Sequence, residues 1–248
     1  DGRYTIQAEK ESGKLFKIVS HDKIINCNLF KNLTLGVDPK IFSSQQTKRY
    51  FSKHNKIKTI EENPIDQVYK KKSFFHKPFF SIENNIVGQS YKEKLLKIKK
   101  YLNKNNSDFV FITAPENVAW LLNIRGFDNP NSPIPSCHLL IDKKNNIYLI
   151  CEKKKAKKII IEKKISKKQV IEFGNFEKLI KDLKGNKMII DYKTCSLFFE
   201  NILKKRFKIL KKEDPIYLLK SIKSNEEIKN MISSHIIDGA ALTKFLYW

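Results

Sequence analysis

The sequence has only four arginines among its 49 basic residues, and this shortage bears on what its large positive charge can mean. A formal net charge of +23 would by itself suggest a nucleic-acid partner. Arginine, however, is the residue that grips phosphates and bases in bidentate fashion, and the lysines are spread along the whole chain. We therefore interpret them as solvated surface filled from a biased codon pool, and keep a nucleic-acid surface as a minor alternative.

Several other signatures are missing. No run approaches the roughly 20 apolar residues of a membrane helix, and no charged start precedes an apolar stretch, so a cytosolic protein without membrane contacts is expected. No CxxC, HxxxH, HExxH or glycine-rich phosphate loop occurs, which argues against zinc knuckles, a disulfide framework and nucleotide binding. The four cysteines are expected to be reduced; they are Cys27, Cys137, Cys151 and Cys195.

Two segments of the chain match one another. The first runs from Leu35 to Lys71 and the second from Met188 to Ser221. Each has an apolar strand ending in an aspartate (Asp38 and Asp191), then a helix-like stretch, a basic strand and an acidic turn ending in Pro-Ile. Self-similarity at a spacing of about 150 residues predicts a duplicated α/β domain, with the first copy cut short at its amino end.

The second copy alternates predicted helices and strands. Apolar positions at helical spacing predict a helix over 91–103, and a nearly continuous apolar run predicts a strand over 109–113. A strand that runs into a polar helix start is expected both at 4–9 and at 147–152. The remaining expected elements are strands at 138–141 and 188–191 and helices at 172–183 and 197–207. This alternation predicts an α/β fold, a mixed sheet flanked by helices.

The stretch ENVAWLLNIRGFDNPNSPIP, from Glu116 to Pro135, places polar residues directly behind an apolar run. Residues 119–122, with Trp120 among them, are expected to form a short turn or strand end packed into the core. Residues 123–135 are expected to form an ordered polar loop. Such loops hold binding and catalytic sites more often than they contribute packing, so this loop is the candidate site.

The last part of the chain has a different pattern. Ser224 followed by Glu227 has capping-box spacing, so a helix is expected to begin there. Apolar residues then recur at three- and four-residue steps and predict an apolar face that needs a cover. We expect a covering domain beyond Trp248, and therefore a fragment of a longer protein. On that face, His235 is expected to be a packed core histidine rather than a metal ligand.

Four ordered stretches carry a family resemblance. They are DGRYTIQAEKE at 1–11, GVDP at 36–39, the 116–135 stretch and SIKSNEEIKNMISSHIIDGAALTKFLYW at 221–248. Together they resemble cytosolic aminopeptidase P, the metal-dependent Xaa-Pro aminopeptidases of the creatinase/prolidase group. The resemblance implies tandem creatinase-like amino-terminal domains and the start of a pita-bread catalytic domain. The implied boundaries are a truncated first domain at 1–72, a linker at 73–90, a second domain at 91–214 and the truncated catalytic start at 215–248.

The resemblance also implies the chemistry of the complete enzyme. Members remove the amino-terminal residue from peptides with proline in second position, using two divalent metal ions, commonly manganese, held by Asp, His and Glu ligands in the catalytic domain. None of those ligands can be assigned in this sequence. We therefore expect this chain alone to bind no metal and to be inactive, and to contribute substrate gating and homodimer contacts.

In relatives the middle-domain stretch lies near the mouth of the catalytic pocket, which implies that Asn123, Arg125 and Asp128 line the approach of the peptide's amino-terminal end. Arg125 is the favoured residue, because a guanidinium holds a carboxylate or carbonyl in fixed geometry where a lysine would be looser. We weigh this role against an Arg125–Asp128 pair that only stiffens the loop, and we expect the pair in preference to the substrate contact.

Two further alternatives remain open. The chain could be a stand-alone, non-enzymatic creatinase-like module that binds a partner through its basic surface or its last helix. The linker also holds an aromatic group, which we expect to dock the linker or to form a subunit contact, with stacking on single-stranded nucleic acid as the alternative. Its members are Phe74, Phe75, Phe79 and Phe80.

Overall fold

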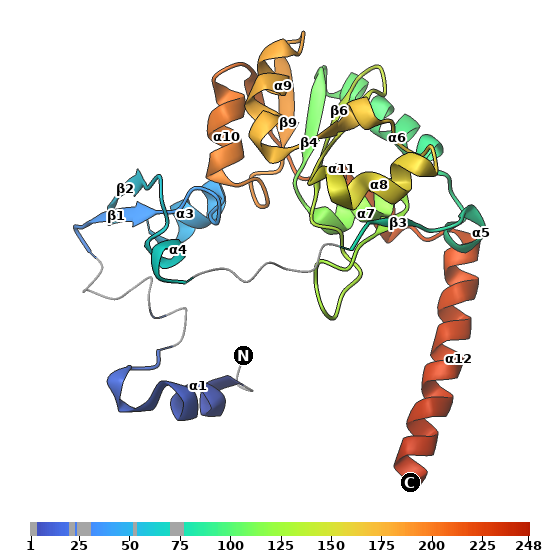
Figure 1. Cartoon of the computed structure of the whole chain (residues 1–248), viewed down its shortest axis with the longest axis horizontal. Helices are drawn as coiled ribbons and strands as arrows, with labels where there is room; N and C mark the ends of the chain where they lie inside the picture. The colour runs from blue at the N-terminus through green and yellow to red at the C-terminus, as the bar shows by residue number, and fades with distance from the viewer. Residues whose placement is uncertain (1–3, 20–22, 24–30, 52–53, 70–76) are drawn as a thin grey trace. The chain divides into compact units, whose positions relative to one another are not determined.

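The computed structural model describes residues 4–19, 23, 31–51, 54–69 and 77–248. The chain divides into two compact units, Asp1–Lys70 and Lys71–Trp248, whose elements are labelled in Figure 1. Of the aromatic linker group, Phe74 and Phe75 lie outside the described residues.

The first unit is small. Its described elements are α1 (Thr5–Ser12), the 3-10 turn η2 (Gly13–Leu15), β1 (Thr34–Val37), α3 (Ser44–Tyr50), β2 (Lys56–Thr59) and α4 (Pro64–Val68). The strand expected at 4–9 is wrong, because this stretch forms the helix α1, none of whose residues is buried. Its Ala, Glu and Lys residues favour a helix, whereas a strand would need a neighbour to pair with.

The second unit is built around a six-stranded mixed sheet and also contains a separate two-stranded sheet. The strands of the unit are β3 (Phe80–Ser81), β4 (Phe109–Ile112), β5 (Ile124–Arg125), β6 (His138–Asp142), β7 (Ile147–Ile150), β8 (Val170–Ile171), β9 (Lys187–Ile190) and β10 (Lys208–Lys211). The order in the sheet is β10-β9-β4-β6-β7-β8, and β3 pairs separately with β5. β4, β6 and β7 are antiparallel, while β9, β10 and β8 join in parallel.

Helices cover both faces of this sheet, as Figure 1 shows. The helices described in this unit are α5 (Asn84–Val87), α6 (Tyr91–Lys104), α7 (Pro115–Leu122), α8 (Lys153–Ile161), α9 (Phe176–Asp182), α10 (Leu197–Lys204), α11 (Pro215–Ser221) and α12 (Asn225–Tyr247), with 3-10 turns η4 (Lys167–Gln169) and η5 (Phe173–Asn175). Alternate residues of β4 face opposite sides. Val110 and Ile112 pack with α6, α7 and α8, whereas Phe109 and Phe111 pack with α9 and α10. The predicted mixed α/β architecture is confirmed.

The two matching segments share one local structure. The first follows the order β1, α3, β2, α4 and the second β9, α10, β10, α11, and in each the two strands are parallel. Asp38 and Asp191 each accept a hydrogen bond from the main-chain N–H two residues further on. α4 and α11 both begin at a proline, and Asn63 and Asp214 cap them. The repeat seen in the sequence is therefore a repeat of structure over these residues.

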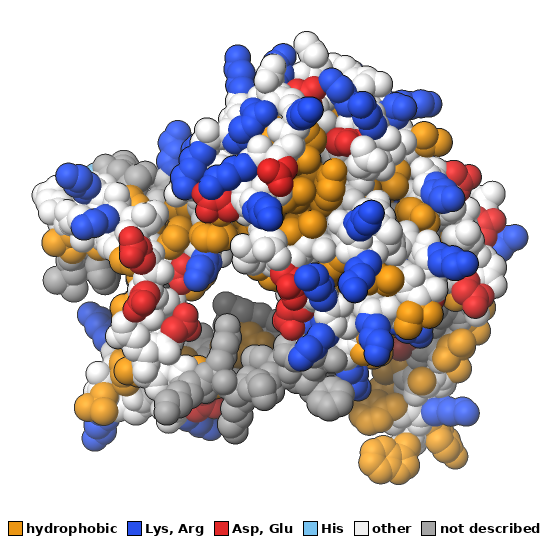
Figure 2. Space-filling view, turned by 45° about the horizontal axis from the view of Figure 1, so that its top comes forward, with side chains coloured by type: hydrophobic (Ala, Val, Ile, Leu, Met, Phe, Trp, Pro, Cys, Tyr) orange, Lys and Arg blue, Asp and Glu red, His pale blue; other side chains and the backbone are white. Residues whose placement is uncertain are grey.

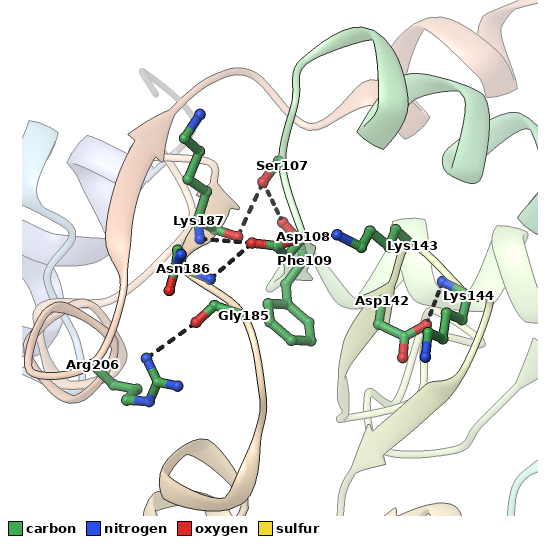
Figure 3. A network of polar contacts seen from close by, with 10 residues as sticks. All are labelled: Ser107, Asp108, Phe109, Asp142, Lys143, Lys144, Gly185, Asn186, Lys187 and Arg206. Carbon is green, nitrogen blue, oxygen red and sulfur yellow. Dashed lines mark hydrogen bonds and ion pairs between the residues drawn. The ribbon is translucent and has the colours of Figure 1, made fainter.

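Asp108 fixes the start of β4 against the turn before β9. Its Oδ2 accepts main-chain hydrogen bonds from Asn186 and Lys187, at 2.8 and 3.1 Å, and its Oδ1 lies 2.6 Å from the ammonium of Lys143 (Figure 3). The pKa of Asp108 is lowered to about 2, mainly by the hydrogen bond from Lys143 and next by the hydrogen bond from Asn186. The carboxylate of Asp108 therefore has a structural role, because it holds two turns together.

The segment expected as a turn or strand end at 119–122 is instead the last turn of α7, so that expectation is wrong. α7 starts at Pro115, a residue favoured at the first helical position, and ends at Asn123, whose left-handed φ of 50° terminates the helix. Its residues Val118, Ala119, Leu121 and Leu122 are all buried. A helix buried on most sides lacks the one-sided apolar pattern by which helices are recognised.

α12 begins as predicted, with a Ser224–Glu227 capping box. None of its residues is buried, and Figure 1 shows it extending away from the sheet. Its first turns bind α5, through Asn230 to the carbonyl of Ile86, but the rest has no cover within the described residues. His235 is exposed, so the expected core histidine is not found in this chain. No helix in the described ranges has the length and apolar character needed to cross a bilayer.

Candidate functional site

The candidate loop begins where α7 ends, and contacts near its first and last residues hold it in place. β5 pairs with β3, with Arg125 opposite Phe80, so part of the predicted linker is a strand that supports the loop. Gly126 donates its N–H to the carbonyl of Pro133 at 3.1 Å. At the tip, the exposed ring of Phe127 packs 5.2 Å from that of Phe80. The loop is therefore ordered, as expected.

Asn123 is buried, and its polar atoms all have hydrogen-bond partners among the described residues. Its Oδ1 accepts a hydrogen bond from Lys94 at 2.6 Å, and its Nδ2 donates to the carbonyl of Gln89 at 2.8 Å. Its own carbonyl accepts from the N–H of Ile82 and from Lys164, both at 2.9 Å. Asn123 thus ties α6, the β3 segment and the loop together.

Lys94 is a buried cation that sequence reasoning missed. Besides Asn123, its ammonium donates to the carbonyl of Trp120 at 2.9 Å and lies 4.0 Å from the centre of the Trp120 ring. Burial lowers its pKa to about 8, against the opposing effect of Glu227. A signal existed, because Lys94 stands one helical turn before Ile98 and two before Leu102, on the buried face of α6.

Arg125 is half-buried beside α7. Its Nη1 donates to the carbonyls of Ile124 at 2.9 Å and Ala119 at 3.3 Å. Burial lowers the pKa of Arg125, and the nearby Glu227 raises it. Within the described residues, Nε and Nη2 have no hydrogen-bond partner. One edge of the guanidinium is therefore anchored and the other retains its donors.

Asp128 is bound by Lys155 rather than by Arg125. The Lys155 ammonium lies 2.5 Å from Asp128 Oδ1, and the N–H of Ser136 donates to Oδ2 at 2.7 Å. Lys155 is itself largely buried, and its second acidic neighbour is Glu152 at 3.5 Å. The alternative in which Arg125 and Asp128 pair is therefore wrong, since the loop is stiffened by a lysine from α8 that no sequence spacing indicated.

The described residues do not fit the metal pair that the family resemblance implies. They contain no group of three or more His, Cys, Asp or Glu side chains that could hold a metal ion. At the ends of β9 and β10, Asp191 and Asp214 lie together, but their four carboxylate oxygens accept hydrogen bonds from protein groups. Burial, the leading cause, raises the pKa of Asp214 to about 6. These carboxylates cap turns and a helix.

The histidine of β6 is also an unsuitable ligand. His138 packs edge-on against Phe111 and Phe199, with its Nδ1 3.0 Å from the carbonyl oxygen of Thr113. Burial lowers its pKa to about 4, so the ring is neutral at physiological pH and serves the core.

This fold and loop define the class of protein to which the chain belongs. The family model of the creatinase/prolidase N-terminal domain matches residues 70–227, and the chain belongs to that family. Over its whole length it is 29% identical to Xaa-Pro aminopeptidase 1 of Dictyostelium discoideum, covering 43% of that protein. It is 25% identical to a probable Xaa-Pro aminopeptidase P of Laccaria bicolor, covering 41%.

A solved structure agrees on the fold. The chain superimposes with a TM-score of 0.79 on the X-prolyl aminopeptidase of Caenorhabditis elegans, described as a cytosolic enzyme with a di-nuclear active site. Identity is 21%, and the match covers 100% of this chain and 44% of that one. The chain thus spans less than half the length of the relatives it matches.

Proposed function

We propose that this chain forms the amino-terminal, non-catalytic part of a cytosolic, metal-dependent Xaa-Pro aminopeptidase, a hydrolase that removes the first residue from peptides with proline in second position. The observation that carries the proposal is the alignment of the whole chain with proteins named Xaa-Pro aminopeptidase. The two divalent metals, manganese in our proposal, would be held by residues outside this chain.

The domain organisation belongs to the same proposal. The β-α-β-α structure repeated around Asp38 and Asp191 supports two tandem creatinase-like domains, of which the first unit is the end of one. The exposed α12 supports a role as the opening helix of a catalytic domain. Homodimer contacts are part of the proposal too. A nucleic-acid partner is not, because basic side chains are scattered among acidic ones on the face shown in Figure 2.

Within the enzyme, Arg125 would gate the approach of the peptide. One edge of its guanidinium is fixed to main-chain carbonyls, and the donors of the other edge have no partner in the part of the chain that the structure describes. Asn123 and Asp128 would act by holding the loop, since their side chains are already bound to Lys94 and Lys155. A peptide carbonyl is a suitable acceptor for the free edge.

The full-length enzyme tests both levels of this proposal. It is expected to release the first residue from peptides with proline second, and to fail on matched peptides with alanine second. Arg125→Lys is expected to raise KM for the proline peptides by about tenfold, because a hydrogen bond to a charged group contributes roughly 1.5–3 kcal/mol.

Arg206→Lys is the matched control, because Arg206 also donates to two main-chain carbonyls, those of Gly185 and Leu183, but lies outside the loop. Its KM is expected to stay unchanged. Equal KM effects from the two variants would reject the gating role of Arg125, whereas cleavage of the alanine peptide would reject the proposed activity itself.

A further inference from the structure

Two buried cysteines face each other at one end of the β6–β7 hairpin. The register pairs His138 with Ile150 at that end, so its next step places Cys137 opposite Cys151. The hairpin residues two and four positions away on the same face are Leu139, Ile141, Ile147 and Leu149, and all six belong to one buried cluster. The two thiols therefore project to the same side of the sheet.

The hydrogen-bond pattern identifies the kind of pair. Asp142 donates its N–H to the carbonyl of Asn146, which makes that opposed pair hydrogen-bonded. Bonded and non-bonded pairs alternate along an antiparallel ladder, so counting back makes Cys137 and Cys151 a non-bonded pair. The N–H of Cys151 agrees, since it donates at 3.0 Å to the carbonyl of Ile171, next to it on the other side.

Non-bonded pairs bring side chains closest. Their Cα atoms are about 4.5 Å apart, within the roughly 4.4–6.8 Å that a disulfide spans. Both thiols are free in this structure. Burial is the main cause that raises the pKa of Cys137, and the neighbouring Cys151 raises it further. This second effect agrees with a short distance between the two thiols. Cys195 is buried in the cluster on the opposite face and has no such partner among the described residues, which do not include Cys27.

We propose that Cys137 and Cys151 are a redox pair, which forms a reversible cross-strand disulfide when the protein meets a peroxide. One thiol loses its proton and attacks a peroxide oxygen, so that an S–O bond forms, the O–O bond breaks and the leaving oxygen takes up the proton and departs as water. The second thiol loses its proton and attacks that sulfur, so that the S–S bond forms, the S–O bond breaks and the hydroxyl takes up the proton and leaves as a second water. Two thiols thus lose two electrons and two protons, and the peroxide is reduced.

Burial sets the conditions for this reaction. It raises the pKa of Cys151 to about 12, so both thiols stay protonated at neutral pH and the pair is reduced in a reducing cytosol. Both cysteines lie just outside the regular strands, where local opening admits a small oxidant. The expectation of reduced cysteines and the proposed disulfide therefore apply to different redox conditions.

The pair lies directly beneath the candidate loop. Cys137 follows Ser136, whose N–H is bound by Asp128, and Cys151 precedes Glu152, which with Asp128 binds Lys155. A disulfide here joins the end of the loop covalently to the start of α8. This inference does not depend on the proposed peptidase activity.

The test treats the folded full-length protein with hydrogen peroxide, blocks remaining thiols and maps the digested peptides by mass spectrometry. The expected product is a Cys137–Cys151 linked peptide, severalfold more abundant than any other cysteine pairing and removed by dithiothreitol. Cys195→Ala is the control and should leave its yield unchanged, while Cys151→Ala should abolish it. The proposal is overturned if the link forms only in urea, or if other pairings are equally abundant.

Discussion

Among single residues, Gly126 is the tightest constraint in the loop. A Cβ there would lie 2.7 Å from Cα of Pro135 and 3.2 Å from the Phe79 ring, and neither the backbone nor a fully buried ring gives way easily. Gly126→Ala is therefore expected to lower the free energy of unfolding by about 1–3 kcal/mol, measured as a shift of the urea midpoint.

Gly174 provides the matched control in a different turn, η5. A Cβ at Gly174 would meet nothing within 4 Å, so Gly174→Ala is expected to be neutral or to stabilise by up to about 1 kcal/mol. If both variants lost the same stability, the contact with Pro135 would not be the cause.

The partners of single charged residues were the least predictable from sequence. The sequence suggests Arg125, three positions away, as the partner of Asp128, but the partner is Lys155, which α8 supplies. Lys94 is one of six lysines in α6, and only its position relative to Ile98 indicates burial. Such pairings depend on how distant elements pack, which local spacing does not encode.

Among elements, α6 and α12 both begin with a capping box, but the loss of this motif should affect the two helices differently. Ser90 and Ser224 each form a capping box, with Glu93 and Glu227. Ser90→Ala is expected to cost about 1 kcal/mol of global stability, because α6 contributes Leu95, Ile98 and Leu102 to the core. Urea unfolding measures this change.

Ser224→Ala is expected to weaken only α12, because that helix buries no residue. Hydrogen exchange should quicken in α12 while the sheet keeps its protection, and the urea midpoint should barely move. A midpoint shift matching that of Ser90→Ala would show that α12 is part of the cooperative core.

Element prediction succeeded where one side of a segment differs from the other. The amphipathic α6 and the start of α12 were predicted from spacing and capping residues, and β4 from its apolar run. The buried α7 was missed because Val118, Ala119, Leu121 and Leu122 present apolar surface on most sides. β3 and β5 are two residues each, too short for any periodicity.

For the whole molecule, the two units differ in how much they bury. Both apolar clusters of the described structure come from residues 79–216, whereas Val37 is the buried apolar residue of the first unit's described part. Amides of β1 and β2 are therefore expected to exchange through openings of lower free energy than those of β4, β6 and β9. Native-state hydrogen exchange measures this, and equal protection would contradict it.

The strand order also dictates the sequence of events during synthesis. β4 lies at the centre of the sheet between β6 and β9. Its partner β6 leaves the ribosome soon after it, whereas β9 follows roughly 80 residues later. The nascent chain therefore presents a growing antiparallel meander whose β4 edge stays open until β9 emerges, an interval in which that hydrophobic edge would depend on chaperones for protection.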